Sequence, residues 1–244
     1  MSNPLLIISI SFNSIFLLTA IILIIQKGGL RYLSNRLFNI INHQKNAIDS
    51  NNPPYYIHKQ SQYKILPCKP TDIIFLGDSI TDEGEWAELF ENPHIKNRGI
   101  SGDTTERILR RLDSILAGQP KQIFLMVGIN DLIMANKSVA ATVIDYRQIL
   151  ERFHNYIPDT KVYIQSVLPV NNHVYLYWQQ NQLITDLNMQ LKDLAKDFSY
   201  NYIDIFSHLV DSQQQLDVKY TSDGLHLNGD AYQVWQNVIN LQFI

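Results

Sequence analysis

The sequence predicts an α/β domain in which helices cover both faces of a parallel β-sheet. Short apolar runs, several of which end at a glycine, alternate with helical segments from residue 73 onward. These runs are continuously apolar, as is typical of strands that are buried on both faces. Polar clusters follow several of the runs, where the functional residues of such folds gather.

The domain is expected to contain five strands and five main helices. The strands are predicted at 73–76, 94–99, 122–127, 161–167 and 200–205. The helices are predicted at 86–90, 104–117, 138–156, 175–198 and 229–241. Asp103 or Thr104 suits the N-cap of the second helix, and Gly118 follows its end. A further short helix at 55–66 is stopped by Pro67.

Composition excludes several classes of protein. The 244 residues suit one domain with an appendage, and a hydrophobic content of 45% can supply a core. A single cysteine, Cys68, excludes an intramolecular disulfide and a cysteine-cluster metal site. The net charge of −3 argues against a nucleic-acid-binding protein.

Charge divides the chain into three parts. Residues 1–26 carry no charged side chain, and residues 27–69 carry seven basic side chains and one acidic side chain. Residues 70–244 carry 13 basic and 22 acidic side chains. We therefore expect a transmembrane anchor at 1–26, a basic juxtamembrane neck and linker at 27–69, and the globular domain at 70–244.

The uncharged run at 4–25 predicts an N-terminal transmembrane helix. As a helix it spans roughly 33 Å, at about 1.5 Å per residue, which suffices for a bilayer core. A cleaved signal peptide is the alternative, but no basic residue precedes the run and no cleavage motif follows it. Lys27, Arg31 and Arg36 follow the run, so the positive-inside rule places the body of this single-pass protein on the cytoplasmic side. The amphipathic segment at 31–42 either lies in the lipid headgroup layer or packs on the body.

Two polar clusters suit nucleophilic catalysis. Ser79 follows the first strand, and at a strand-to-helix turn its hydroxyl and N–H face the functional edge of the sheet. An ordinary N-cap serine has the same pattern. Asp223 precedes His226 by three residues, so its carboxylate can reach Nδ1 and leave Nε2 free as a base.

Two further clusters can bind negative charge. Gly99, in the cluster at 97–103, can present a backbone N–H to a ligand, and Asn130, in the cluster at 128–131, carries an amide that can donate to an oxyanion. Each cluster also suits a purely structural role, the first as a turn that requires glycine and the second as a turn with an Asx cap.

The four clusters together resemble the SGNH hydrolases, also called GDSL esterases and lipases. The matching blocks are GDSI, NRGISGDTT, GIND and DGLH, within a stretch from about residue 70 to 240. The second block and the ending DGLHLNGDAYQVW resemble the branch of platelet-activating-factor acetylhydrolase catalytic subunits and bacterial acylhydrolases. Ile80 stands where the family name has leucine.

The resemblance implies a role for each matched residue. Ser79 would be the nucleophile, His226 the base and Asp223 the residue that orients it. The Ser79 N–H, the Gly99 N–H and the Asn130 side chain would form the oxyanion hole. The implied fold is a flavodoxin-like three-layer α/β/α sandwich with a five-stranded parallel sheet, and no metal or cofactor is implied.

The expected function is a membrane-anchored serine esterase that cleaves a short acyl or acetyl ester of a small molecule, lipid or glycan. An acyltransferase that uses the same acyl-enzyme is an alternative. A silent membrane-tethered binding module is disfavoured because all four blocks are intact, and a nucleotide-binding protein is disfavoured because no phosphate-binding glycine loop follows the first strand. The stretch at 169–178 is a candidate pocket wall, although Tyr175, Tyr177 and Trp178 equally suit helix packing, the commoner use.

Overall fold

The computed structural model describes residues 19, 22, 25, 26, 29, 53–174 and 181–240. The chain divides into two units, Met1–Pro54 and Tyr55–Ile244. The predicted transmembrane helix at 4–25 lies mostly outside the described residues, and the amphipathic segment at 31–42 lies wholly outside them. Among the residues that are described, no helix is both long enough and apolar enough to cross a membrane.

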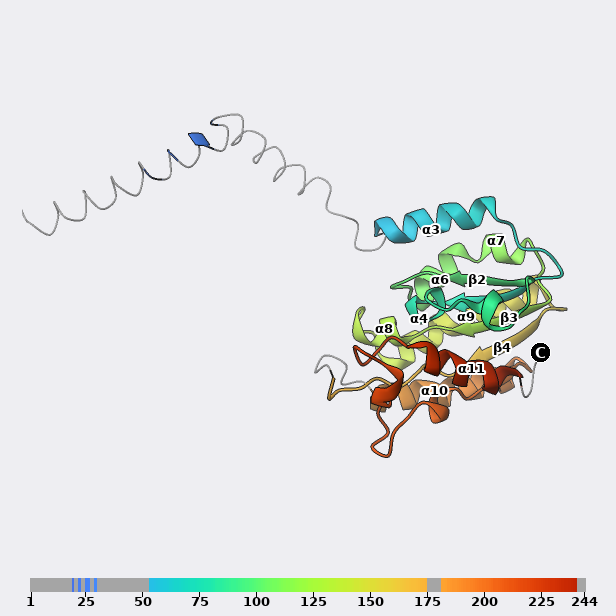
Figure 1. Cartoon of the computed structure of the whole chain (residues 1–244). Coiled ribbons are helices and arrows are strands. Elements are labelled where there is room, and N and C mark those ends of the chain that lie inside the picture. The colour runs from blue at the N-terminus through green and yellow to red at the C-terminus, as the bar shows by residue number, and fades with distance from the viewer. Residues whose placement is uncertain are drawn as a thin grey trace, which may run out of the picture. The chain divides into compact units, whose positions relative to one another are not determined.

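A five-stranded parallel sheet forms the centre of the second unit, as the sequence predicted (Figure 1). The strands are β1 (Ile73–Gly77), β2 (Ile95–Gly99), β3 (Gln122–Met126), β4 (Lys161–Gln165) and β5 (Asn201–Ile203). Their order is β2-β1-β3-β4-β5, and neighbours pair in parallel throughout. The chain therefore crosses β1 when it passes from β2 to β3, and both neighbours of β1 contribute loops beside the residues that follow it.

Each predicted helix is present apart from its ends, and two short helices that directly follow β1 and β3 are additional to the predicted ones. They are α3 (Pro54–Ile65), α4 (Ser79–Asp82), α5 (Trp86–Leu89), α6 (Thr105–Arg111), α7 (Asp113–Leu116), α8 (Ile129–Ile133), α9 (Val139–Tyr156), α10 (Asn181–Asp197) and α11 (Gly229–Asn240), with short 3-10 turns at Phe206–His208 and Val218–Tyr220. The helix predicted at 104–117 is divided at Leu112, which keeps helical dihedral angles, so α6 runs almost directly into α7. The predicted start of α10, at 175–180, lies outside the described residues.

Aromatic rings join one face of the sheet to its covering helices. Phe75, Phe124 and Tyr163 are neighbours in register, and their rings stack with centroids 4.9 and 4.5 Å apart. Trp86 of α5 stacks on Phe75 at 4.3 Å, and Trp235 of α11 meets Trp86 edge-on at 4.8 Å. Burying each such ring stabilises the fold by about 1.5–3 kcal/mol. These contacts place α5 and α11 on this face.

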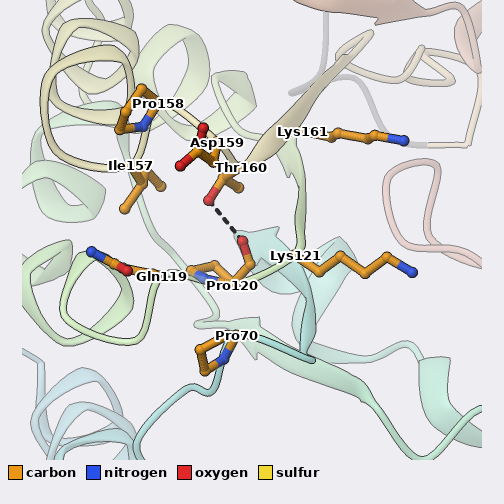
Figure 2. A pocket seen from close by; sticks show the side chains of 9 residues that line it. All are labelled: Pro70, Gln119, Pro120, Lys121, Ile157, Pro158, Asp159, Thr160 and Lys161. Atoms are coloured by element: carbon orange, nitrogen blue, oxygen red, sulfur yellow. Dashed lines mark hydrogen bonds between the residues drawn. The ribbon is translucent and has the colours of Figure 1, made fainter.

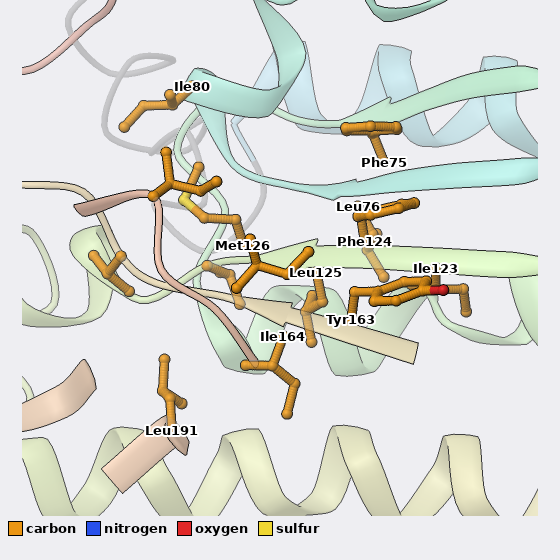
Figure 3. Packing of buried hydrophobic residues seen from close by; sticks show 14 of the residues in the cluster. Phe75, Leu76, Ile80, Ile123, Phe124, Leu125, Met126, Tyr163, Ile164 and Leu191 are labelled. Carbon is orange, nitrogen blue, oxygen red and sulfur yellow. The ribbon is translucent and has the colours of Figure 1, made fainter. Parts of the chain in front are cut away.

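Aliphatic side chains fill the space on the other face. Helices α6, α9 and α10 pack side by side there, as right-handed crossovers from β2, β3 and β4 require. Ile164 of β4 points toward Leu191 of α10, and both are fully buried (Figure 3). The domain is therefore a three-layer sandwich whose loops after β1, β2 and β3 share one edge.

Helix α3 packs on the domain, although its residues lie within the stretch at 27–69 that is expected to form the neck and linker. Its buried tyrosines, Tyr56 and Tyr63, form a small separate cluster with Ile100. The two tyrosines are seven residues apart, so they lie on one side of the helix, two turns from each other. Ile100 directly follows β2, and α3 therefore contacts the loop that carries the second polar cluster.

Candidate active site

Ser79 is the first residue of α4, directly beyond the end of β1. Asp78 caps this short helix, because its Oδ1 accepts a hydrogen bond from the Ile80 N–H at 3.1 Å. Gly77 makes the sharp reversal possible, since a Cβ there would lie 2.2 Å from Thr81 Oγ1 and 2.3 Å from the Met126 carbonyl oxygen. The strand-to-helix turn predicted from the sequence is thus present, with the Ser79 side chain at its head.

The structure brings Ser79, His226 and Asp223 into one hydrogen-bonded chain. His226 Nε2 lies 3.0 Å from Ser79 Oγ, and His226 Nδ1 lies 2.7 Å from Asp223 Oδ2. Asp223 Oδ1 also accepts the backbone N–H of Leu225 at 2.9 Å and that of His226 at 2.8 Å. The carboxylate is thereby held against Nδ1, which leaves Nε2 to exchange a proton with the serine hydroxyl.

Asp223 remains ionised in this setting. Partial burial by itself raises the pKa of the Asp223 carboxyl, but the hydrogen bonds from the His226 ring and from the backbone N–H groups of Leu225 and His226 outweigh it, and the net pKa is lowered. An ionised Asp223 favours the Nδ1–H tautomer of His226 and stabilises the imidazolium that forms when Nε2 takes a proton.

Asn130 lies beyond β3, near the start of α8, and is buried. Its Nδ2 donates one hydrogen to the Asp103 carbonyl oxygen at 2.9 Å, which leaves the second amide hydrogen to bind another acceptor. Asp131 holds the same loop from its other side by accepting the Thr105 N–H at 2.9 Å and the Thr105 hydroxyl at 2.6 Å. The third polar cluster therefore fixes the loop between β2 and α6.

The expectation for Gly99 needs correction. Its N–H donates to Asn97 Oδ1 at 2.8 Å, so it is already paired within its own loop. A Cβ on Gly99 would lie 2.2 Å from the Asp82 backbone nitrogen. Close approach of α4 therefore explains the glycine, and an anion-binding role does not.

Gly102 offers a backbone N–H that the sequence analysis did not consider. It occupies a turn closed by the Asp103 N–H, which donates to the Ile100 carbonyl oxygen at 3.0 Å. Its φ of +80° is one that glycine adopts without strain. Among the described residues, neither the Gly102 N–H nor the Ser79 N–H has an acceptor. The signal was present in the sequence, since the block ISGD holds a second glycine three residues after Gly99.

Buried charges lie beneath this edge of the sheet. The Arg111 guanidinium pairs with Asp103 Oδ2 at 2.7 Å and donates to the carbonyl oxygens of Arg98 and Gly77 at 2.8 and 3.2 Å. Burial raises the pKa of Asp103 to about 6, although Arg111 opposes the shift. Burial also raises the pKa of Asp78 to about 8, and Asp78 Oδ2 has no hydrogen-bond partner among the described residues.

A cavity of about 370 Å³ lies away from these residues (Figure 2). Lys121 precedes β3 and Lys161 begins β4, so the cavity opens at the amino ends of the strands. Thr160 Oγ1 donates to the Pro120 carbonyl oxygen across it, at 2.7 Å. Ser79 follows the carboxyl end of β1, at the opposite edge, so this cavity is separate from the cluster of Ser79, His226 and Asp223. The candidate pocket residues at 175–178 lie outside the described residues.

An α/β sandwich in which serine, histidine and aspartate meet at the carboxyl edge of the sheet has the architecture of a serine hydrolase. The sequence profile of the GDSL-like Lipase/Acylhydrolase family matches residues 75–234. The chain belongs to this family, and it is a carboxylic-ester hydrolase.

Individual relatives agree with the family. The chain is 29% identical over 177 residues to the platelet-activating factor acetylhydrolase IB subunit alpha2 of Rattus norvegicus, covering 69% of this chain and 75% of that protein. A Streptococcus pneumonia structure, assigned as a platelet activating factor, is 31% identical with a TM-score of 0.71, covering 76% of this chain and 91% of that one. A GDSL-like lipase from Bacteroides thetaiotaomicron, at 22% identity, shares the fold with a TM-score of 0.65 over 76% of this chain and 95% of that one.

Proposed function

We propose that this protein is a serine esterase that cleaves a short acyl or acetyl ester through an acyl-serine intermediate. The observation that carries the proposal is the chain of hydrogen bonds from Ser79 Oγ through His226 to Asp223, at 3.0 and 2.7 Å. A serine hydroxyl is a weak nucleophile by itself, and a base within hydrogen-bond reach activates it.

In the acylation step, Ser79 Oγ attacks the ester carbonyl carbon while His226 Nε2 takes the hydroxyl proton. The tetrahedral intermediate collapses, His226 returns that proton to the leaving alcohol, and the acyl group stays on Ser79. Water then attacks the acyl-serine, with His226 again accepting and returning a proton. The products are the carboxylic acid, the alcohol and the regenerated Ser79.

The negative charge on the intermediate needs donors beside Ser79. We assign the Ser79 N–H, the Gly102 N–H and the second Nδ2 hydrogen of Asn130, with Gly102 replacing Gly99. The support for Gly102 is that Asn130 is hydrogen-bonded to the carbonyl oxygen of Asp103, the next residue in the same turn. Donors fixed before the reaction stabilise developing charge without the cost of reorganisation.

The His226 side chain is partly exposed to solvent, on the side from which we expect the substrate to enter. His226 keeps about a third of its side chain exposed, and the partly exposed Glu83 lies 3.8 Å from Nε2. An exposed histidine edge suits an ester whose alcohol part extends into solvent, as a lipid headgroup or a glycan does. The likeness to platelet-activating factor acetylhydrolase subunits supports a short acyl group.

The test is a panel of p-nitrophenyl esters from acetate to long-chain acyl groups, assayed with the full chain in detergent. We expect the highest kcat/KM at the shortest chains and stoichiometric labelling of Ser79 by a fluorophosphonate. A higher kcat/KM for long-chain esters would contradict the proposed preference for short acyl groups. A protein that hydrolyses none of the esters and is not labelled by the fluorophosphonate would contradict the proposed esterase activity.

We also propose that residues 4–25 anchor the protein in a membrane as a single span, with the body on the cytoplasmic side. The support is the uncharged length of the run and the basic residues that follow it. An inserted span resists alkaline carbonate, whereas a basic neck alone would be released by salt, at about 1 kcal/mol per basic residue. Release by salt would refute the anchor, and digestion of the body by external protease on spheroplasts would refute the cytoplasmic side.

A further inference from the structure

Asp82 is the last residue of the short helix that Ser79 begins, and its side chain is 4% exposed. It is not part of the proposed proton path. Its carboxylate nevertheless has four partners: Lys59 Nζ at 2.6 Å, the Tyr55 hydroxyl at 2.6 Å, the Ser101 N–H at 3.2 Å and the Ser101 hydroxyl at 3.0 Å.

These partners belong to two other elements. Ser101 immediately precedes Gly102 in the turn that presents the proposed oxyanion donor, and Lys59 and Tyr55 come from α3. Because Asp82 accepts both the N–H and the hydroxyl of Ser101, it fixes the backbone and the side chain of this residue together. One carboxylate therefore connects the nucleophile's helix, the oxyanion turn and α3.

Helix α3 holds the same loop at further points. The Tyr63 hydroxyl donates to the Gly99 carbonyl oxygen at 2.7 Å, and the Tyr56 hydroxyl reaches the Arg107 carbonyl oxygen at 3.3 Å. Ile100 is buried against both tyrosine rings. Contacts thus run from α3 to Gly99, just before the turn, and to α6, which follows it. Helix α3 lies outside the residues that the family profile matches.

We propose that the Lys59–Asp82 ion pair is a positioning device for the oxyanion hole, through which α3 sets the place of the Gly102 N–H relative to Ser79. This inference rests on the proposed function. Without Lys59, the Asp82 carboxylate would lose its charged partner while almost fully buried, and it would turn toward water or take up a proton. Either change loosens its two hydrogen bonds to Ser101, and the Gly102 N–H would then be misplaced.

The electrostatics agree with a tight pair. Burial acts to lower the pKa of the Lys59 ammonium, but the hydrogen bond to Asp82 and the negative charge of Asp82 outweigh it, and the net pKa is raised. Lys59 therefore stays charged at every pH at which the esterase would be assayed.

The first experiment compares Lys59→Met with the matched control Lys64→Met in the full-length protein, with p-nitrophenyl acetate as substrate. Both changes remove a lysine from α3 at little cost in helix propensity, but Lys64 is exposed. We expect Lys59→Met to lower kcat about tenfold with KM within twofold, because a misplaced donor acts on the transition state. Lys59→Arg should restore most of the rate, and Lys64→Met should match the wild type.

A double-variant cycle separates positioning from general damage. If Lys59 acts through the oxyanion hole, its removal should cost much less in an Asn130→Ala background, because both changes disable one device. If the reductions in kcat caused by Lys59→Met and Asn130→Ala simply multiply in the double variant, the proposal is wrong. It is also wrong if Lys59→Met alone has the kcat of the wild type. Should Lys59→Met fail to fold, Tyr55→Phe removes only a hydroxyl donor to Asp82 and should still lower kcat severalfold at constant KM.

The outcomes also separate this inference from the proposed function. Suppose that a fluorophosphonate labels Ser79 and that Ser79→Ala is inactive, but that Lys59→Met is fully active. Only the proposed positioning role of the Lys59–Asp82 pair would then be refuted. If wild-type Ser79 does not label, the esterase mechanism itself falls.

Discussion

Tyr232 donates its hydroxyl hydrogen to the Ile80 carbonyl oxygen at 2.7 Å, and so ties α11 to α4. Ile80 directly follows Ser79, and Tyr232 comes six residues after His226. Burial raises the pKa of the Tyr232 hydroxyl, which therefore remains a donor throughout the working pH range. Ser79 and His226, 147 residues apart in the sequence, are thus held near each other by a bond that involves neither side chain.

Tyr232→Phe should cost roughly 0.5–1.5 kcal/mol of unfolding free energy, because one neutral hydrogen bond is lost while the ring stays packed. It should also lower kcat severalfold, since the distance between Ser79 and His226 is less strictly held. Urea unfolding and p-nitrophenyl acetate kinetics measure the two effects. A variant with the stability and rate of the wild type would show that the bond is incidental.

Ser79→Ala should abolish esterase activity, by on the order of a millionfold in kcat, while the fold persists. His226→Ala should be nearly as severe. The double variant should be no slower than either single variant, because the two residues act as a unit. Steady-state kinetics beside a circular dichroism melt checks this, and a tenth of the wild-type rate in Ser79→Ala would refute its role.

Asn130→Ala should lower kcat by roughly 10²–10³-fold, the usual cost of one lost oxyanion donor. KM should change little, because the amide meets charge that develops only in the transition state. A raised KM at constant kcat would instead make Asn130 a ground-state substrate contact. Since Asn130 also holds the Asp103 carbonyl, some loss of stability should accompany the loss of rate.

Asp78→Asn should change how stability depends on pH. Burial raises the pKa of Asp78 from 3.8 to about 8, so between these values the folded state holds a proton that the unfolded state has released. Wild-type stability should therefore fall as pH rises through this window, by at most about 1.4 kcal/mol per pH unit from this group. The variant has no such proton. Its free energy of unfolding, measured with urea, should therefore increase relative to that of the wild type from pH 5 to pH 8. A constant stability difference would contradict the shift.

The sequence predicted the sheet and the meeting of Ser79, His226 and Asp223 because each rests on a local pattern. Continuous apolar runs mark strands buried on both faces, and β1, β3 and β4 are such strands. The polar clusters after the strands meet because parallel strands end at one edge. The Asp223–His226 contact follows from a spacing of three residues, which needs no knowledge of the rest of the fold.

The predictions that failed depend on which polar groups pair with one another in the folded chain. Gly99 and Gly102 are alike in a sequence, and only the fold shows that one N–H is paired with Asn97 while the other is not. Arg111, which the sequence analysis does not single out, is buried. Asp103 neutralises its charge, and the carbonyl oxygens of Gly77 and Arg98 accept hydrogen bonds from its Nη2, a combination that no local pattern indicates.

The long separation between Ser79 and His226 makes enzymatic turnover a measure of complete folding. The two side chains meet only when the first strand and the loop before the last helix are both in place. A chain still partly unfolded would lack the contact even where most of its sheet had formed. Loss of esterase rate in denaturant should therefore coincide with the global transition, and recovered rate after dilution should count the molecules that have refolded from end to end.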